Sequence, residues 1–335
     1  MGLEAEKYLE KSKEIIAKCM NCDPEEVYFT GSATEACNWA IQILREKKCN
    51  LIYKEYEHSA VMKSIYAFEE KYENIPKERN GYIQMLVQNI YGEIFTVPQR
   101  ENENDLIFMD ATAAAGHMPI DFKTMGIDLL AFGAHKFNGI RGAGCLIIRK
   151  ELTPIRSIIW GGDVTGGTPA PALAWAMASA LKWNCDHMLE HSQYIIELRD
   201  YMIDELLNIN HCAGLNGPRD NRASNNINVA FSFIDGKKIM ERLADEYNIC
   251  ISTGSACSAD DYISKSGGIC VRQLNAEKNR KKRVPEVITI FEAGGLNSDY
   301  ATNSIRITLG FENTKEECQE TIERIQEIIK DEIPF

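Results

Sequence analysis

The chain has 335 residues, of which 44% are hydrophobic and 26% are charged, and its formal net charge is −12 at pH 7. This length and apolar content predict a globular protein with one large domain and a smaller one. The acidic balance argues against general nucleic-acid binding, which requires a basic face.

The sequence gives no sign of a membrane span, because no apolar run reaches the length of a bilayer crossing. The first residues, Met1-Gly-Leu-Glu-Ala-Glu-Lys, are too charged for a signal peptide, so we expect a cytoplasmic protein. The eleven cysteines follow no disulfide framework, which in a reducing compartment predicts buried thiols and one reactive thiol. Cys19-Met-Asn-Cys22 has no second pair at metal spacing, so we predict no metal site.

The N-terminal part reads as a helix over residues 3–19 and a strand over residues 27–30. A turn, Gly31-Ser32-Ala33-Thr34, then opens an amphipathic helix that continues to residue 44. Free amides and the positive end of the helix create an anion site there, to which Thr34 adds a hydroxyl. Alternatively, Ser32 or Thr34 simply caps the helix.

Polar residues follow each of the next two predicted strands. The strand over residues 51–53 leads to a helix that begins at Glu57-His58, and the apolar run 85–89 ends on Asn89. His58 either lies flat on a cofactor ring and moves protons, or is a partly buried residue of the junction.

The central stretch carries the strongest chemical signal. An apolar strand, residues 105–110, ends on Asp110, and two apolar runs within residues 127–148 enclose His135-Lys136. If the strands are parallel neighbours joined by a right-handed crossover, Asp110 and Lys136 emerge at one carboxyl edge, where α/β folds bind ligands. Pyridoxal phosphate needs a lysine for its aldehyde and a carboxylate for its ring nitrogen.

The pattern changes after residue 149 to that of a smaller α+β domain. It contains a glycine loop at 160–168, helices at 172–183, 236–247 and 315–330, and strands at 226–233, 250–252 and 304–308. Residues 264–303 read as a polar insertion whose basic run 278–283 is solvated or docks a partner. We expect a large α/β domain over 13–183, with a mostly parallel sheet, and a small domain over 184–335 on which residues 1–12 pack.

In their order, these motifs resemble the cysteine desulfurases of the class V aminotransferase family, which are fold type I enzymes that use pyridoxal 5′-phosphate. The resemblance covers residues 13–328. It implies that Ser32, Ala33 and Thr34 bind the cofactor phosphate and that His58 stacks on the ring. Asn89 would contact the ring hydroxyl and the substrate.

The resemblance also assigns the central motif and the glycine loop. Asp110 would hold the pyridine nitrogen, Lys136 would carry the cofactor as a Schiff base, and His135 would lie beside it. Thr168 would reach the phosphate bound by the partner subunit, which implies a homodimer.

In the C-terminal part, Ser252-Thr-Gly-Ser-Ala-Cys257 resembles the mobile loop that carries the sulfur-accepting cysteine. Arg306 would bind the substrate carboxylate. Sulfur would pass from L-cysteine to Cys257 as a persulfide and alanine would be released, with Lys136 and His58 as the other catalytic residues. The acceptor would be a sulfur-transfer or iron–sulfur scaffold protein, for iron–sulfur cluster or thio-cofactor synthesis.

Some positions depart from the family pattern. Ala113 stands where the family usually has Gln, and Gly133 where it has Ser or Thr, which predicts weaker cofactor binding. The chain would also be shortened at its N-terminus. Two alternatives stay open: a weakened homologue that serves as a scaffold for sulfur-transfer partners, or a related enzyme such as a selenocysteine lyase or aminotransferase. Cys37, Cys145 and Cys250 lie in apolar patterns and should be buried.

Overall fold

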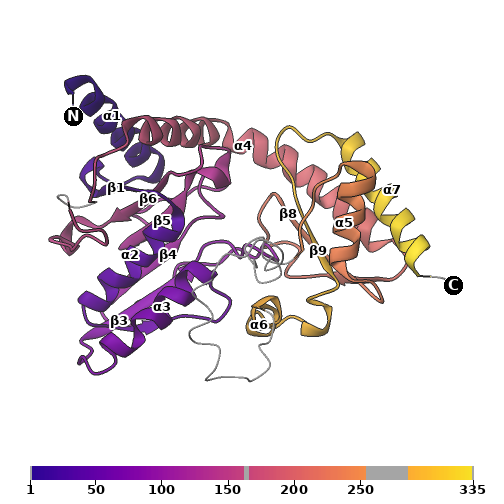
Figure 1. The fold of residues 1–335 in the computed structure, drawn as a ribbon, viewed down its shortest axis with the longest axis horizontal. Helices are drawn as coiled ribbons and strands as arrows, with labels where there is room; N and C mark the ends of the chain where they lie inside the picture. Colours follow the sequence, from indigo (N-terminus) through magenta and orange to yellow (C-terminus); the bar gives the residue numbers. More distant parts are fainter. Residues whose placement is uncertain (1, 162–165, 254–285, 334–335) are drawn as a thin grey trace, which may run out of the picture. The chain divides into compact units, whose positions relative to one another are not determined.

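The structure, a computed structural model, describes residues 2–161, 166–253 and 286–333 (Figure 1). Two compact units are present: unit 1 comprises Met1–Asn89 and Glu93–Tyr194, and unit 2 comprises Ile90–Gly92 and Ile195–Phe335. The boundary falls at residue 194 rather than at the expected residue 183. Both positions lie within one continuous helix, α4 (Pro171–Leu207). Residues 2–12 lie in unit 1, not with the small domain as expected from the sequence.

Unit 1 is built on a six-stranded sheet in the order β1-β6-β5-β4-β3-β2. Its strands are β1 (Val27–Thr30), β2 (Cys49–Ile52), β3 (Arg79–Met85), β4 (Leu106–Asp110), β5 (Leu129–Gly133) and β6 (Gly144–Ile148). Strands β2 to β5 run parallel, whereas β6 pairs antiparallel with both β5 and β1. The predicted mostly parallel sheet is confirmed, and β6 is the strand that runs against the others.

Helices cover the sheet of unit 1. They are α1 (Leu3–Met20), α2 (Ala33–Glu46), α3 (Ser59–Tyr72) and the first part of α4, with short 3₁₀ turns η1 (Pro24–Glu26), η2 (Ala134–Phe137) and η3 (Lys150–Leu152). The apolar face of α2 meets α3 and the sheet in one buried cluster, in which Trp39 is the largest side chain. Because β4, β5 and β6 are buried along their whole length, they read as continuous apolar runs.

Unit 2 packs helices on a three-stranded antiparallel sheet, β7 (Cys212–Leu215), β8 (Asn226–Phe231) and β9 (Ser304–Thr308). Its helices are α5 (Gly236–Tyr247), α6 (Glu286–Ala293), α7 (Lys315–Glu332), the last part of α4 and the 3₁₀ turn η6 (Ser298–Tyr300). The predicted strand at 250–252 is wrong: only Ser252 forms a bridge, with Arg306, and Cys250 is exposed.

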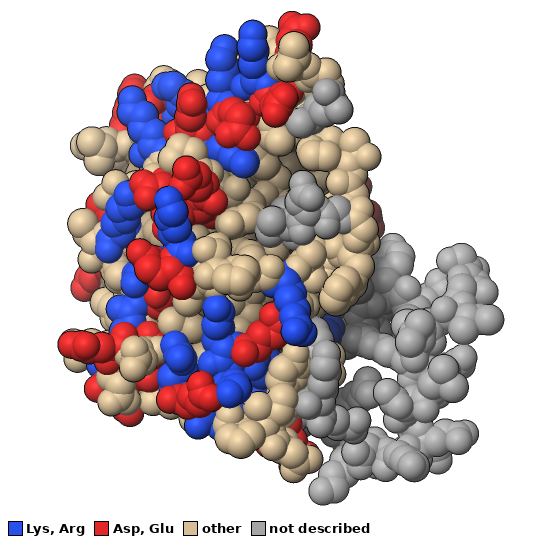
Figure 2. Space-filling model, turned by 90° about the vertical axis from the view of Figure 1, so that its left-hand side faces the viewer, with Lys and Arg blue, Asp and Glu red and all other residues tan. Residues whose placement is uncertain are grey.

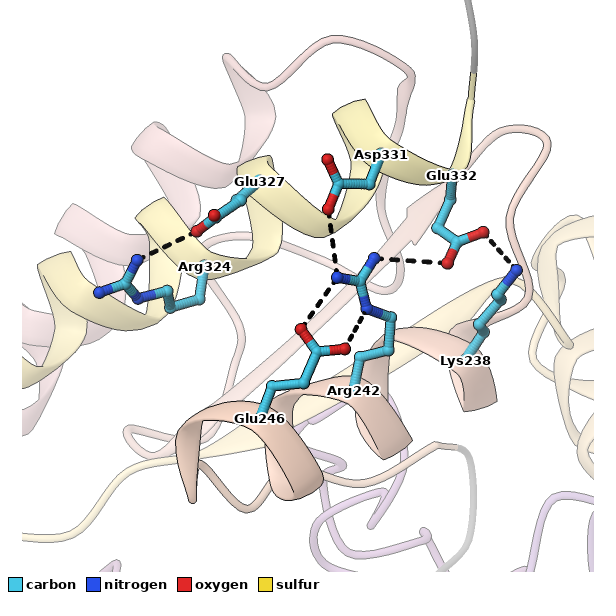
Figure 3. A network of polar contacts seen from close by, with 7 residues as sticks. All are labelled: Lys238, Arg242, Glu246, Arg324, Glu327, Asp331 and Glu332. Atoms are coloured by element: carbon cyan, nitrogen blue, oxygen red, sulfur yellow. Dashed lines mark hydrogen bonds and ion pairs between the residues drawn. The ribbon is translucent and has the colours of Figure 1, made fainter.

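Helices α5 and α7 of unit 2 are joined by an ionic network at the surface (Figure 3). The Arg242 guanidinium pairs with Glu246 on its own helix at 2.6 Å and with Asp331 and Glu332 on α7 at 3.1 and 3.3 Å. Lys238 also pairs with Glu332. The network fixes the pairing of two helices whose apolar faces cover the same sheet.

On the face seen in Figure 2, Lys and Arg side chains alternate with Asp and Glu side chains, which is typical of a solvated surface. In the described ranges, none of the helices combines the length and the apolar character that a bilayer crossing requires. Across the same residues, no three His, Cys, Asp or Glu side chains come together as a metal site.

Candidate active site

Asp110 ends β4 inside the protein, with 3% of its surface exposed. One carboxylate oxygen, Oδ1, accepts a hydrogen bond from the Thr112 amide at 2.9 Å. The Cys37 thiol, on the buried face of α2, donates a second hydrogen bond to Asp110. Burial and the charge of Asp110 raise the pKa of Cys37 well above its usual value, so this thiol keeps its proton.

Glu57 is a second carboxyl group close to Asp110, and it is 1% exposed. Its Oε1 accepts a hydrogen bond from the Met85 amide at 3.2 Å, while Oε2 has no partner among the described residues. Burial first, and then the charge of Asp110, raise the pKa of Glu57 well above its usual value. Burial beside Asp110 therefore favours the protonated form of Glu57, whose Oε1 contacts the last residue of β3.

Lys136 lies in η2, three residues after β5 ends, and its side chain is exposed. Because β4 and β5 are parallel neighbours, with Asp110 opposite Ala131, Asp110 and Lys136 follow strands that end at the same edge. The connection between the strands consists of turns rather than the expected helix. His117, in that connection, lies with Nε2 2.8 Å from the Lys136 carbonyl oxygen, so Nε2 must be the donor.

The partial burial of His117 and His135 favours the neutral form of each imidazole. Burial lowers the pKa of both, and the Lys136 charge lowers that of His135 further. Since His135 is exposed and adjacent to Lys136, it adds a neutral donor or acceptor to this edge.

The glycine turn lies against the end of β5. An added Cβ at Gly133 would lie 3.1 Å from the Ala33 Cβ, so the two backbones approach closely. Ser32 caps α2, as in the simpler of the two readings, by accepting a hydrogen bond from the Glu35 amide. Glu35 in turn accepts one from the Gly31 amide at 2.8 Å. By helix geometry the amides of Ala33 and Thr34 have no intrahelical acceptor, so they remain suited to an anion.

His58 stands at the start of α3, where its Nδ1 accepts a hydrogen bond from the Ala60 amide at 3.1 Å. This cap places the proton of the neutral ring on Nε2 and fixes the ring at the junction. Asn89 is half-buried and follows β3 beyond Gln88. Both residues therefore belong to the strand ends of unit 1.

Three predicted site residues are not brought to this edge by the described contacts. Thr168 is exposed in unit 1, next to residues 162–165 that the structure does not describe. Arg306 belongs to β9 of unit 2, where its backbone pairs with Ser252. Cys257 and the basic run 278–283 lie outside the described residues.

The sequence reasoning overlooked the polar contacts beneath Asp110. Cys37 was assigned only to the buried face of its helix, which is correct, and Glu57 only as the neighbour of His58. A helical spacing that buries Cys37 with Ala36 and Ala40 was visible in the sequence. Its contact with Asp110 was not, because the two residues are far apart in the chain.

Comparisons with known proteins identify the family of the chain. The family model described as "Aminotransferase class-V" matches residues 1–321. The cysteine desulfurase IscS of Dictyoglomus turgidum is 30% identical, over 98% of this chain and 85% of its own length. That of Methanosarcina thermophila is 28% identical, over 98% and 83%.

Among solved structures, a protein described as NifS-like superposes with a TM-score of 0.82 at 24% identity, over 98% of this chain and 89% of its own. At this identity the likeness speaks for the fold, which is fold type I. The family match over residues 1–321 and the relative at 30% identity show that the chain belongs to the class-V aminotransferase family.

Proposed function

We propose that the chain is a pyridoxal 5′-phosphate-dependent cysteine desulfurase, which moves sulfur from L-cysteine to Cys257 and releases alanine. The observation that carries the proposal is the position of Asp110 and Lys136 after two neighbouring parallel strands. The relatives that are 28–30% identical over 98% of the chain are cysteine desulfurases, which supports this reaction over others of the family.

The residues at this edge fit the cofactor. Buried Asp110 supplies an acceptor for a protonated ring nitrogen. The Thr112 hydroxyl beside it is buried and lacks a hydrogen-bond partner among the described residues, so it can bind a polar group of a ligand. The amides of Ala33 and Thr34, together with the Thr34 hydroxyl, suit a phosphate, and Gly133 leaves the turn close to β5.

Side chains of unit 1 have separate roles in the proposal. Lys136 would hold the cofactor aldehyde through Nζ and would carry protons from and to the substrate carbons. His58 stacks on the ring and offers the Nε2 proton that its cap at Nδ1 leaves in place. Asn89 contacts the ring hydroxyl and the substrate. When bound, the cofactor accepts electron density from the substrate, which weakens its carbon–sulfur bond.

The sulfur-transfer step needs Cys257 and Arg306. Arg306 binds the substrate carboxylate through its guanidinium. The Cys257 thiolate attacks the substrate sulfur, so a sulfur–sulfur bond forms while the carbon–sulfur bond breaks. The released electron pair stays with the substrate carbon, which takes up a proton to give alanine. The persulfide then passes to an acceptor for iron–sulfur cluster or thio-cofactor synthesis.

The proposal includes a homodimer in which Thr168 completes the phosphate site of the other subunit. The exposed side chain of Thr168 is compatible with this role. Trp160, 83% exposed in the same segment, gives the surface an apolar anchor of the kind found at interfaces.

Cofactor binding is tested first, by adding pyridoxal phosphate and recording visible absorption. Lys136→Ala should lose the visible band, whereas Lys150→Ala, which changes a surface lysine paired with Glu25, should keep it. Borohydride reduction followed by peptide mapping should label Lys136, and a label on another lysine would refute the assignment.

Sulfur transfer is tested by sulfide release from L-cysteine. Cys257→Ser should keep the visible band and release no sulfide, whereas Cys250→Ser, which changes an exposed cysteine nearby in sequence, should retain activity. If the unmutated protein binds cofactor but never acquires sulfur on Cys257, another reaction of the family replaces this one. If it binds no cofactor, the scaffold role replaces the enzyme.

A further inference from the structure

The motif Cys19-Met-Asn-Cys22 ends α1, but the fold separates its two thiols. Cys22 is buried, and burial raises the pKa of its thiol to about 12. Cys19 instead forms a thiol hydrogen bond with Cys185 of α4. Both Cys19 and Cys185 are half-buried free thiols, and neither takes part in the candidate active site.

This contact belongs to an ordered packing of α1 on α4, which lie side by side in Figure 1. Near the start of α1, Tyr8 packs edge-on against Trp175 with the ring centroids 5.2 Å apart. Cys19 follows Tyr8 by 11 residues and Cys185 follows Trp175 by 10. These spacings correspond to about 16 and 15 Å of helix, so the helices run parallel and hold the thiols at one level.

The two thiols differ in their tendency to ionise. The hydrogen bond from Cys19 lowers the pKa of Cys185, and the Lys182 ammonium, three residues earlier on α4, lowers it further. Burial and the charge of Asp186 act in the opposite direction. The same contact raises the pKa of Cys19, so this thiol keeps its proton and donates the hydrogen bond to Cys185. Cys185 is thus suited to attack a disulfide first, and Cys19 is suited to attack the mixed disulfide that results.

We propose that Cys19 and Cys185 form a redox-active thiol pair that reacts with low-molecular-weight disulfides such as glutathione disulfide. The Cys185 thiolate attacks one glutathione sulfur, which forms a mixed disulfide and releases one glutathione thiolate. Cys19 then loses its proton to that thiolate or to water and attacks the Cys185 sulfur, releasing the second glutathione. Two protein thiols are oxidised, one glutathione disulfide is reduced to two thiols, and α1 becomes covalently joined to α4.

The test is equilibration of the purified full chain in glutathione buffers from reducing to oxidising, followed by acid quenching, alkylation and peptide mapping. The expected product is a Cys19–Cys185 disulfide whose fraction rises with the oxidised glutathione, and which also forms in Cys22→Ser. In Cys19→Ser, the mixed disulfide on Cys185 should accumulate because the second thiol is absent.

Three results would overturn the proposal. The first is a Cys19–Cys22 linkage in the unmutated protein. The second is both Cys19 and Cys185 remaining reduced under conditions that modify exposed Cys250. The third is an unchanged thermal midpoint of unfolding when the oxidised and reduced proteins are compared, since a link between α1 and α4 should raise it. Because the unmutated protein gives these readouts, the test holds even if Cys19→Ser folds poorly.

Discussion

Gly133→Ser tests the closest backbone approach at the candidate site. The substitution restores the residue type that the family usually has, but the added Cβ would lie 3.1 Å from the Ala33 Cβ and 3.4 Å from the Ala33 amide nitrogen. Carbon atoms pack best at about 3.5–4.0 Å, so the strand end or the start of α2 must move. Gly133 has an extended backbone with φ −134° and ψ 137°, so serine adds no backbone strain.

Two effects of this substitution oppose each other. Overpacking of this kind costs about 1–3 kcal/mol of stability, and each kcal/mol lowers the unfolding midpoint by roughly 2–4 °C in a domain of about 150–250 residues. A serine hydroxyl that reached the phosphate would add roughly 1.5–3 kcal/mol of binding. We therefore expect a less stable cofactor-free protein that binds pyridoxal phosphate about tenfold more tightly.

Ala33→Gly provides the matched control, because it removes the atom that the new side chain meets. Urea unfolding of the cofactor-free single and double variants gives a coupling energy, and cofactor titration gives the affinities. Ala33→Gly should recover most of the stability that Gly133→Ser loses, apart from the cost of a helical glycine, roughly 0.5–1 kcal/mol. Equal unfolding free energies for the unmutated protein and Gly133→Ser, or no recovery in the double variant, would refute the reasoning.

Three further predictions concern stability. Gly144→Ala should be more damaging than Gly133→Ser in urea unfolding, because its Cβ would lie 2.4 Å from the backbone carbon of Ser32, which cannot swing away. Burial and the charge of Asp110 raise the pKa of Glu57 in the folded protein above its ordinary value of 4.5. The unfolded chain therefore releases this proton at a lower pH than the folded protein, and the free energy of unfolding falls as the pH rises above 4.5. The side chain in Glu57→Gln cannot ionise, so the unfolding midpoint of this variant should rise relative to that of the unmutated protein as the pH increases from about 5 to about 8. A difference in midpoint that stays constant with pH would contradict a protonated Glu57. Arg242→Ala should lower the midpoint of unit 2 more in low salt than in high salt, since it removes contacts between α5 and α7 (Figure 3).

Much of unit 1 could be predicted because strand ends carry polar residues after apolar runs. This pattern predicts one strand that ends on Asp110 and another that precedes Lys136, and β4 and β5 do pair in parallel. The antiparallel direction of β6 has a signal in the sequence. Residues 134–143 are the whole connection from β5 to β6, and so short a link cannot make the crossover that a parallel neighbour needs.

Unit 2 was harder to predict because its weaker elements depend on their neighbours. β7 contains Gly214 and an irregular register against β8, so neither its composition nor its alternation indicates a strand. Residues 250–252 show the opposite error. Their apolar character suggested a strand, yet only Ser252 bridges to β9 and Cys250 is exposed. In both cases the outcome is decided by pairing across the sheet, which is not encoded locally.

The polar cluster under the sheet edge explains why Asp110 is suited to a cationic ligand. The Cys37 thiol keeps its proton and donates a hydrogen bond to Asp110, and burial beside the same charge favours the protonated form of Glu57. The cluster therefore concentrates its negative charge on Asp110. The hydrogen-bond donors described for Asp110, the Thr112 amide and the Cys37 thiol, are both neutral. A buried carboxylate is costly unless a charged donor compensates it, and a protonated ring nitrogen provides such a donor. Binding of the cofactor and stability of unit 1 should accordingly rise together.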